Sequence, residues 1–599
     1  MDIVFINDVN FASYNILPQL GSVCLHNIIK KKYESSIINF DYLMFNGEIK
    51  VSKNMDENIS NFANFILEKE PKIVSFYSMC NTYPTTILIA QKIRECNKYI
   101  KIIVGGPQAT VTARETLENF SCFDIVGLGE AELYFLQLID TLLSTESEIL
   151  SKLAKISGIA YRKGRDIELN YNQYLVPITH LGSYNDYNYN DALNLISKVD
   201  VGITNYKFQI ESGRGCPFNC TFCSTSIFFK RECRIKDVDT IINEISLFSK
   251  KYGLQHFSLD HDMLTFNKNY ILDFSNKFKK NFPDMYWACS SRLDTLDNEM
   301  IIEMAESNCE SMFVGFESGS ARIQKIINKN LDIKNSIKKV RYLEELGIKV
   351  TTSFIYGFPD ETIDDFLETI NVITKLFIIG TNTVLLQKFM PLPKTVENTK
   401  VQNRYFDIHR INTSITSNCL LSEKHIKLIT EYPDIFTCFY TYDSAIIDQY
   451  KHLDFLINKF SLLKKIFRYT IKLIIEKDGL INYYRKNEEY IKNFYFKTFN
   501  REITEYMSHK EERIFILDFI KQLVLNDTRD FIKEIYRFEK IRDDYLIGVL
   551  KDSKIYKFNY NLFDLYFNGF IHEEIGEFYI LFQMKDNKLN ISNIDIVSN

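Results

Sequence analysis

The sequence lacks the features that would place the protein in a membrane, outside the cell or on nucleic acid. It contains no apolar run of 18 residues, and its first residues, MDIVFINDVN, lack the positive flank and long apolar stretch of a signal peptide. The formal net charge is −5 and the pI is near 6.1, so no broad basic field exists, although a local basic groove is compatible with this composition. We expect a soluble protein with no membrane span and no nucleic-acid partner.

The cysteines do not form a disulfide framework, and neither internal repeats nor low-complexity tracts stand out. The 599 residues hold 12 Cys, most of them scattered singly, whereas disulfide-stapled domains are short and dense in Cys. Three Cys do lie close together, and a group of thiolates needs a reducing compartment. We therefore expect a cytoplasmic protein. At roughly 100–200 residues per domain, the length predicts three or four domains.

Residues 1–145 show the alternating pattern of a parallel βα sheet. Short apolar runs predict strands at 3–7, 35–40, 72–78, 101–106 and 124–129, with helical patterns between them, as at 17–31 and 83–97. We expect a doubly wound, Rossmann- or flavodoxin-like sheet, which binds ligands at the carboxyl ends of its strands. Small or turn-forming residues there let a large flat ligand approach the backbone. The candidate cofactor contacts are Ser75, Ser78, Gly105, Gly106, Pro107, Gln108, Gly127, Gly129 and Glu130.

Three further regions follow this sheet. Residues 146–200 contain ISGIAYRKGRDIELN, which predicts a hairpin, and the non-periodic SYNDYNYND, which predicts a linker. Residues 201–395 resume the βα rhythm, and their six predicted strands suit a partial (β/α)6 barrel better than an eightfold one: 206–212, 256–260, 286–291, 311–316, 349–355 and 382–389. Residues 396–599 are mostly helical in pattern, at 447–475 and 511–525, and end in the strand-like runs IGVLKD, KIYKFNY and FYILFQM.

The run SGRGCPFNCTFC carries the chemistry-bearing cysteines. Cys216, Cys220 and Cys223 have CxxxCxxC spacing, which gives three soft thiolates to one metal centre and no fourth protein ligand. A [4Fe–4S] cluster normally takes one Cys per iron, so three Cys leave one iron open. The alternative is a closed zinc site with Cys233 as the fourth ligand, but Cys233 lies ten residues past Cys223 without a matching CxxC knuckle.

This run resembles the signature of the radical S-adenosylmethionine (radical SAM) enzymes, with Phe222 as the aromatic that usually precedes the third Cys. The resemblance implies that the open iron chelates the amino and carboxylate groups of S-adenosylmethionine. One electron from the cluster then cleaves the sulfonium and gives a 5′-deoxyadenosyl radical. An electron donor such as flavodoxin or ferredoxin is implied as a partner.

Three later segments resemble the same family and lie at predicted strand ends. FVGFESGS at 313–320 is similar to the fourth-strand segment, in which Glu317 and Ser318 would bond the ribose or methionine part of the cofactor; an ordinary helix N-cap at Ser318 or Ser320 is the alternative. SFIYGFPDET at 353–362 is similar to the fifth-strand segment near the adenine; the alternative is that Asp360 and Glu361 are ordinary dipole complements at a helix N-terminus. FMPLPKT at 389–395 resembles the sixth-strand PLPGT segment with Lys394 in place of Gly. The implied cofactor contacts in the fifth-strand segment are Ser353, Ile355, Gly357 and Glu361.

Polar residues after the second and third strands are the candidate catalytic groups. SLDHDMLT offers Asp260, His261 and Asp262, of which either Asp could accept the ammonium of the methionine part. His261 is a candidate acid or base because of its ordinary pKa, although a solvated loop His is the alternative. Arg292 in SSRLD is a candidate carboxylate partner for the cofactor, with a surface salt bridge as the alternative.

The N-terminal sheet resembles the cobalamin-binding domain that precedes the radical domain in one large subgroup. The resemblance is carried by VGGPQAT at 104–110 and DIVGLGEAE at 124–132, whose glycines would accommodate the nucleotide tail of cobalamin. The DxHxxG motif that supplies a cobalt-ligating His elsewhere is absent, and His26 lies in a helical apolar pattern. We expect cobalt without a His ligand from this domain. A flavodoxin-like sheet with a vestigial pocket or another nucleotide is the alternative.

Taken together, the resemblance covers residues 1–395 and implies a cobalamin-dependent radical SAM enzyme with a [4Fe–4S] cluster, S-adenosylmethionine and cobalamin. We interpret it as a methyltransferase that acts on an unactivated carbon of a peptide, natural product or lipid, with residues 396–599 helping to define the substrate. A cobalamin-dependent cyclisation or rearrangement would share every motif. A non-catalytic cobalamin or redox sensor is a hypothesis of another class. A methylthiotransferase would need further cluster Cys in the N-terminal domain, where Cys24, Cys80, Cys96 and Cys122 are widely spread.

Overall fold

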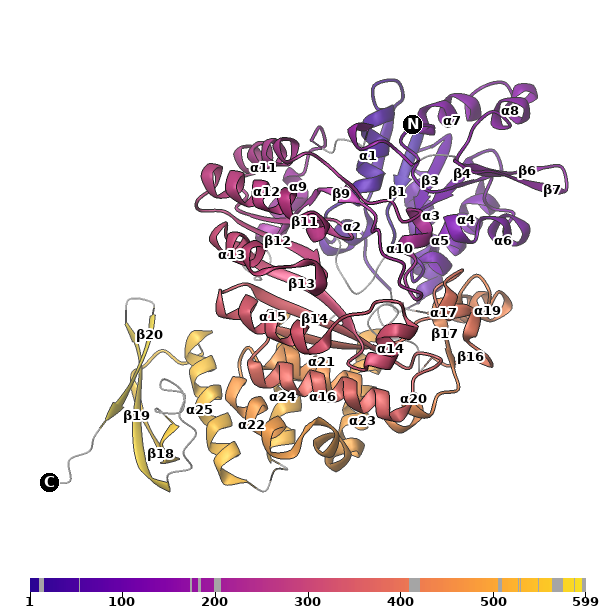
Figure 1. Ribbon diagram of the computed structural model, residues 1–599. Coiled ribbons are helices and arrows are strands. Elements are labelled where there is room, and N and C mark those ends of the chain that lie inside the picture. Colours follow the sequence, from indigo (N-terminus) through magenta and orange to yellow (C-terminus); the bar gives the residue numbers. More distant parts are fainter. Residues whose placement is uncertain are drawn as a thin grey trace.

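The computed structural model describes residues 1–599 except 10–15, 53, 173–174, 181–184, 199–205, 409–420, 505–508, 526, 528, 548, 563–574, 586–587 and 595–599. Figure 1 shows an N-terminal α/β domain beside a second α/β domain, with a helical C-terminal region against the second domain and a small sheet at the far end. Within the described residues, no helix is both long and apolar enough to span a membrane.

The N-terminal domain is built on a seven-stranded sheet of order β2-β1-β3-β4-β5-β6-β7. Its first five strands are parallel and the hairpin β6–β7 adds two antiparallel strands, so the predicted doubly wound sheet and hairpin are both present. The strands are β1 (Ile3–Ile6), β2 (Ser35–Ile38), β3 (Ile73–Tyr77), β4 (Lys101–Gly105), β5 (Ile125–Gly127), β6 (Ile159–Lys163) and β7 (Asp166–Asn170).

Helices cover both faces of this sheet because its strands alternate side chains between two cores. On β1, Val4 and Ile6 pack with one core, which includes α3 and α4, whereas Ile3 and Phe5 pack with the other, which includes α7. The helices are α1 (Leu20–Ile29), α2 (Phe40–Phe45), α3 (Met55–Leu67), α4 (Tyr83–Cys96), α5 (Pro107–Val111), α6 (Ala113–Asn119), α7 (Phe135–Leu142) and α8 (Glu146–Leu153).

The second domain holds a six-stranded, wholly parallel sheet of order β15-β14-β13-β12-β11-β8, as predicted for a partial barrel. A short antiparallel pair, β9 with β10, lies beside it. The strands are β8 (Phe208–Glu211), β9 (Gly213–Arg214), β10 (Arg234–Ile235), β11 (His256–Asp260), β12 (Tyr286–Ser291), β13 (Cys309–Glu317), β14 (Lys349–Tyr356) and β15 (Thr383–Lys388). The helices are α9 (Asn190–Lys198), α10 (Thr225–Phe228), α11 (Val238–Tyr252), α12 (Lys268–Asn281), α13 (Asn298–Glu306), α14 (Ala321–Ile326), α15 (Ile333–Glu345), α16 (Ile363–Ile379) and α17 (Val396–Lys400).

The region after residue 400 divides into three parts. A pair of short strands and one helix lead into a helical bundle, and a three-stranded antiparallel sheet follows. The elements are β16 (Arg404–Phe406), α19 (Glu423–Glu431), β17 (Tyr440–Tyr442), α20 (Ala445–Gln449), α21 (Leu453–Leu463), α22 (Arg468–Asp478), α23 (Leu480–Thr504), α24 (His509–Leu525), α25 (Asp530–Leu546), β18 (Lys554–Tyr560), β19 (Ile575–Lys585) and β20 (Lys588–Ile594).

One predicted strand is wrong. The run IGVLKD at 547–552 forms no strand in its described residues, because the backbone amides of Val549 and Leu550 return to the carbonyl of Asp544 and close the end of α25. Similarly, the non-periodic stretch predicted as a linker is partly packed: Tyr189 is 1% exposed and lies against Phe208 and Phe248.

Helix α21 closes the edge strand of the second sheet with side-chain hydrogen bonds. The amide of Leu386 donates to Asn458, whose side chain donates back to the carbonyl of Leu386, and Ser461 bonds Val384 in the same way. An edge strand otherwise presents unpaired amides and carbonyls to other chains. The helical region thus completes the second domain.

The segment at 421–442 packs back onto the N-terminal domain. Leu428, Ile429, Phe436 and Phe439 belong to the same apolar core as α3 and α4. The side chain of Gln108 donates to the carbonyl of Ile435 at 2.6 Å. This returning segment is therefore part of the first domain in space, although it follows the second in sequence.

Candidate functional site

The cysteine loop leaves β9, crosses above the carboxyl ends of the second sheet and returns through α10 to β10. Two glycines permit this path. Gly215 has φ +87° and a Cβ there would lie 2.0 Å from the carbonyl of Glu232, while a Cβ on Gly213 would lie 2.1 Å from the carbonyl of Arg234. The amide of Gly215 donates to Asp262 at 2.8 Å. The loop is held by close backbone approach to β10 and by one carboxylate after β11.

Cys216, Cys220 and Cys223 are half-buried and unbridged, as thiolate ligands of a cluster must be. Burial raises the pKa of Cys220, and Lys329 and Arg292 oppose that rise. Within the described residues, no three His, Cys, Asp or Glu side chains converge on one point that would hold a single metal ion. Cluster-bound thiolates sit on separate iron atoms and need no such convergence. Three unbridged Cys on one loop suit a [4Fe–4S] cluster, which takes one Cys per iron.

Arg292 lies beside this loop rather than at the surface. It is 7% exposed, its guanidinium carbon lies 3.8 Å from the ring centroid of Phe218, and its Nη1 lies 3.5 Å from the sulfur of Cys220. The remaining guanidinium nitrogens donate to Asp294 and to the carbonyl of Lys329. The surface salt-bridge alternative does not apply, because the group is buried against the cluster loop.

The fourth-strand segment brings a buried ion pair to the site. Glu317, with φ +64°, accepts a hydrogen bond from Lys329 at 2.7 Å, and both side chains are nearly enclosed. The hydroxyl of Ser318 bonds Thr369 of α16 and accepts from the amide of Ser320, and its contact with a cofactor stays a prediction. The contact of Glu317 with a cofactor stays a prediction, and Lys329 is a charged group that the sequence patterns did not indicate.

The fifth-strand segment turns sharply after β14. Gly357 has φ +82°, and its amide and that of Phe358 both donate to Glu361, at 2.5 and 3.2 Å. Burial raises the pKa of Glu361 to about 8, and its second oxygen has no partner within the described residues. The ring of Phe222 lies 5.8 Å from that of Phe358, so the cysteine loop and this turn meet. Ser353 is buried and Ile355 half-buried on β14, and their cofactor contacts stay predictions.

The three residues after β11 differ in what they can do. Burial raises the pKa of Asp260 to about 6, and Ser258 donates to this carboxyl at 3.1 Å. Asp262 is committed to the cysteine loop through Gly215. His261 accepts from the amide of Met263 at 2.7 Å through Nδ1, and its Nε2 lies 3.2 Å from the carbonyl of Arg234. Both ring nitrogens are used, so the geometry favours a structural role for His261 over the predicted catalytic one.

A cavity of about 250 Å³ lies at the carboxyl edge of the N-terminal sheet. Seven of the predicted contacts line it: Ser75, Gly105, Gly106, Pro107, Gly127, Gly129 and Glu130. Among the described residues, a Cβ on Gly105 or Gly129 would meet no atom within 4 Å, so no described side chain or backbone crowds either glycine. The other side of the cavity comes from the second domain, from Glu211, Arg214, Phe228 and Phe229.

The hydroxyl of Tyr134 tests whether this cavity suits a ligand. Tyr134 lines the cavity, is 5% exposed, and its buried hydroxyl has no hydrogen-bond partner within the described residues. An orphaned buried hydroxyl is destabilising unless a bound molecule satisfies it. The open glycines and this hydroxyl together fit the polar tail of a large flat cofactor.

Two of the predicted contacts are not on the cavity wall. Gln108 is turned toward the returning segment, where it bonds Ile435. Ser78 is fully buried, its amide donates to the carbonyl of Gly105, and a Cβ on Gly106 would lie 2.6 Å from its carbonyl oxygen. Both residues shape the turn after β4 instead of contacting the cavity.

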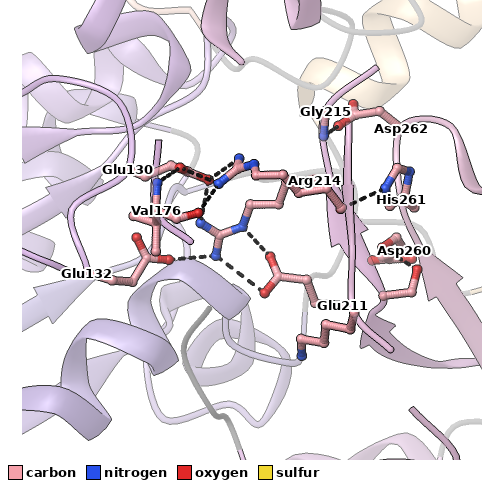
Figure 2. Close-up of polar contacts among 12 residues, drawn as sticks. Glu130, Glu132, Val176, Glu211, Arg214, Gly215, Asp260, His261 and Asp262 are labelled. Atoms are coloured by element: carbon pink, nitrogen blue, oxygen red, sulfur yellow. Dashed lines mark hydrogen bonds and ion pairs between the residues drawn. The ribbon is translucent and has the colours of Figure 1, made fainter. Parts of the chain in front are cut away.

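Figure 2 shows an ion-pair network that joins the two domains beside this cavity. Arg214, two residues before Cys216, pairs with Glu130 at 3.0 Å, Glu132 at 2.6 Å and Glu211 at 2.6 Å. Arg234 also pairs with Glu130, at 2.7 Å. The carboxylate of Glu130 is thus paired with two arginines, so its observed role is at the interface between the domains. Its predicted contact with a cofactor stays a prediction. Burial raises the pKa of Glu130, the arginines outweigh this effect, and the net pKa is lowered.

Two family models match the chain: the radical SAM superfamily over residues 210–373 and the B12 binding domain over residues 7–139. An uncharacterized methyltransferase of Pyrococcus horikoshii is 28% identical over 369 residues, which are 60% of this chain and 74% of that protein. Among solved structures, the cobalamin-dependent S-adenosylmethionine radical enzyme OxsB with aqua-cobalamin bound has a TM-score of 0.51 at 16% identity and covers 92% of this chain and 82% of its own. The radical S-adenosylmethionine methyltransferase TsrM of Kitasatospora setae has a TM-score of 0.51 at 12% identity, over 66% and 74% of the two chains.

Proposed function

We propose that the chain, which the radical SAM superfamily model matches over residues 210–373 and the B12 binding domain model over residues 7–139, is a cobalamin-dependent methyltransferase acting on an unactivated carbon of a small molecule or peptide. Its cofactors are a [4Fe–4S] cluster, S-adenosylmethionine and cobalamin. When bound, the cluster and S-adenosylmethionine supply one-electron chemistry, and cobalamin supplies a transferable methyl group. A one-electron donor of the flavodoxin or ferredoxin type is the proposed partner.

The observation that carries this proposal is the shared cavity between the domains. Its walls combine the strand ends of the first sheet, such as Gly105 and Gly129, with Arg214 and Phe228 from the segment that contains the cluster cysteines. Under this proposal, a group held at the first sheet would lie close to a group held by the cysteine loop. Such positioning is the protein's contribution when cofactors carry the reaction.

The chain's own residues divide this work. Cys216, Cys220 and Cys223 would hold the cluster, and Arg292 would donate toward the sulfur of Cys220. Arg214 fixes the distance between the two cofactor sites by pairing with carboxylates of both domains. Phe228 and Phe229 supply an apolar part of the cavity wall.

The test is anaerobic reconstitution of the full chain with iron, sulfide and cobalamin, followed by incubation with S-adenosylmethionine and a reductant. We expect bound iron and sulfide, a cobalamin absorption spectrum and release of 5′-deoxyadenosine. Cys220→Ala should lose the cluster and the cleavage. Cys96→Ala is the matched control, because Cys96 is an exposed thiol at the end of α4 in the first domain.

Two outcomes would contradict the proposal. A Cys220→Ala variant that keeps the cluster and still cleaves S-adenosylmethionine would refute the assignment of the site. A product whose mass shows rearrangement without an added methyl group would refute methyl transfer while leaving the cofactors in place. Loss of iron on Cys233→Ala would instead identify a fourth thiolate ligand.

A further inference from the structure

A second and larger cavity lies at the opposite end of the second domain from the cysteine loop. Its volume is about 1060 Å³, and it is lined by the carboxyl ends of α15 and α16 and by residues of α22 and α25. Glu344 on its wall accepts the amide of Val350 at the start of β14. Gly357, beside the proposed cofactor site, lies seven residues after Val350, which corresponds to roughly 23 Å of strand.

Six cationic side chains line this cavity: Arg341, Lys464, Lys465, Arg468, Lys472 and Arg542. Among the described residues of its wall, only Glu344 and Glu345 oppose them, and Glu344 is occupied by the amides of Val350 and Asn382. The described part of the chain gives Lys472 a single ion pair, with Glu476 at 3.7 Å, and gives Arg341, Lys465 and Arg468 none. The cavity therefore carries a strong excess of positive charge within a chain that is acidic overall.

Lys464 is the second, independent indication of a ligand. Its ammonium is buried and makes no hydrogen bond within the described residues; it lies 5.3 Å from the ring centroid of Phe377. Burial lowers the pKa of Lys464 to about 7, against the attraction of Glu344. A buried amino group without a hydrogen-bond partner is destabilising in the free protein, and a bound anion would satisfy it and favour its charged form.

Helix C-termini explain only part of this charge. The C-terminal carbonyls of α16 attract cations, and the guanidinium of Arg468 approaches Gly380, the C-cap of that helix, within 3.4 Å of a Cβ built there. One such partner per helix end would be sufficient. Lys464, Lys465 and Arg542 come from other elements and converge on the same space.

We propose that this cavity binds a phosphorylated small molecule, with its phosphoryl oxygens on Arg468, Lys464 and Lys465. Guanidinium and ammonium groups are the side chains that bind phosphate most strongly. The volume matches that of small-molecule sites, and Tyr469 and Ile471 supply a partly apolar wall for the organic part of the ligand. This site is separate from the proposed cofactor sites.

Isothermal titration of the full chain with inorganic pyrophosphate tests the site. We expect saturable binding with one site per chain and a Kd at or below about 1 mM. The double variant Arg468→Gln with Lys465→Gln should weaken that binding by about tenfold or more, because each lost cation removes a charge-assisted hydrogen bond. Both residues are exposed, so the variant retains the fold.

The matched control is Arg165→Gln with Lys98→Gln, which removes the same two charges from exposed positions of the first domain. Unchanged binding in this control supports the site. Absence of saturable binding, or equal weakening in both double variants, overturns it. A 12-nucleotide DNA strand that binds more tightly than pyrophosphate through Arg468 and Lys465 would overturn the assignment to a small molecule. Cleavage of S-adenosylmethionine is measured in parallel, so failure here is distinguishable from failure of the proposed function.

Discussion

Replacement of Arg214 by Met tests whether the interdomain ion pairs hold the two cofactor sites together. The side chain is 13% exposed and is shared by three carboxylates, with its closest contacts at 2.6 Å to Glu132 and Glu211. Removing one partner of a buried ion pair costs about 3–5 kcal/mol, because the remaining charges stay buried without compensation. That range corresponds to a rise on the order of 10² to 10³-fold or more in the population of the locally opened interface.

Hydrogen–deuterium exchange of the full chain measures this opening directly. Peptides that cover 124–135 and 208–215 should lose protection in Arg214→Met, whereas the centre of β14 should not. Lys268→Met is the control, since Lys268 also pairs with two carboxylates, Asp297 and Glu299, but is 43% exposed and should lose less than about 1 kcal/mol. Protection factors within threefold of the native chain in the interface peptides would refute the reasoning. A triple variant that also carries Glu132→Gln and Glu211→Gln should recover part of the protection.

Three further predictions concern the cavity and the sheet beside it. Tyr134→Phe should raise the melting temperature of the cobalamin-free chain and weaken cobalamin binding by about tenfold, because the unpartnered hydroxyl is destabilising until a ligand satisfies it. A lower melting temperature, or an unchanged affinity for cobalamin, would contradict this. Gly105→Ala should leave the melting temperature unchanged, since its Cβ meets nothing within 4 Å, and should lower cobalamin affinity by about tenfold; an unchanged spectroscopic titration would show that the ligand lies elsewhere. Burial raises the pKa of Asp8 from 3.8 to about 6. Between these pH values the folded chain holds a proton that the unfolded chain has lost, so the free energy of unfolding falls as the pH rises through this window. Asp8→Asn should therefore be more stable than the native chain by about 3 kcal/mol above pH 6 and should lose this advantage near pH 4; a difference independent of pH would exclude the carboxyl as its cause.

Periodicity was sufficient to predict the two parallel sheets. The strands at 256–260 and 286–291 coincide with β11 and β12, because buried strands of a parallel sheet are short apolar runs with turn residues at both ends. The run IGVLKD has the same composition, but it follows a helix whose last turn captures its amides. A local pattern cannot distinguish an apolar helix end from a strand.

The cysteine loop was also predictable, whereas the contacts that position it were not. The three Cys are identified by their spacing alone. Arg214 and Glu130 are 84 positions apart, and no short-range pattern relates them. Short-range patterns also miss Lys329, Tyr134 and the returning segment, because tertiary packing brings them to the site. Their position at strand ends was sufficient to predict that the glycines of the first sheet line the cavity. Ser78 and Gln108 also follow strand ends but do not line it, because a strand end does not determine the direction in which a side chain points.

The returning segment has a consequence for the order in which the protein is made. The first sheet leaves the ribosome early. Ile435, which satisfies Gln108, is encoded 327 positions after that glutamine, and Phe436 and Phe439, which cover part of the apolar face of the sheet, follow it. At about 5–20 residues per second, the face stays open for roughly 15–65 s of translation. Chaperones can bind it during this interval, and a chain truncated before residue 428 would expose it permanently. The first domain to be synthesised is thus completed only after the second.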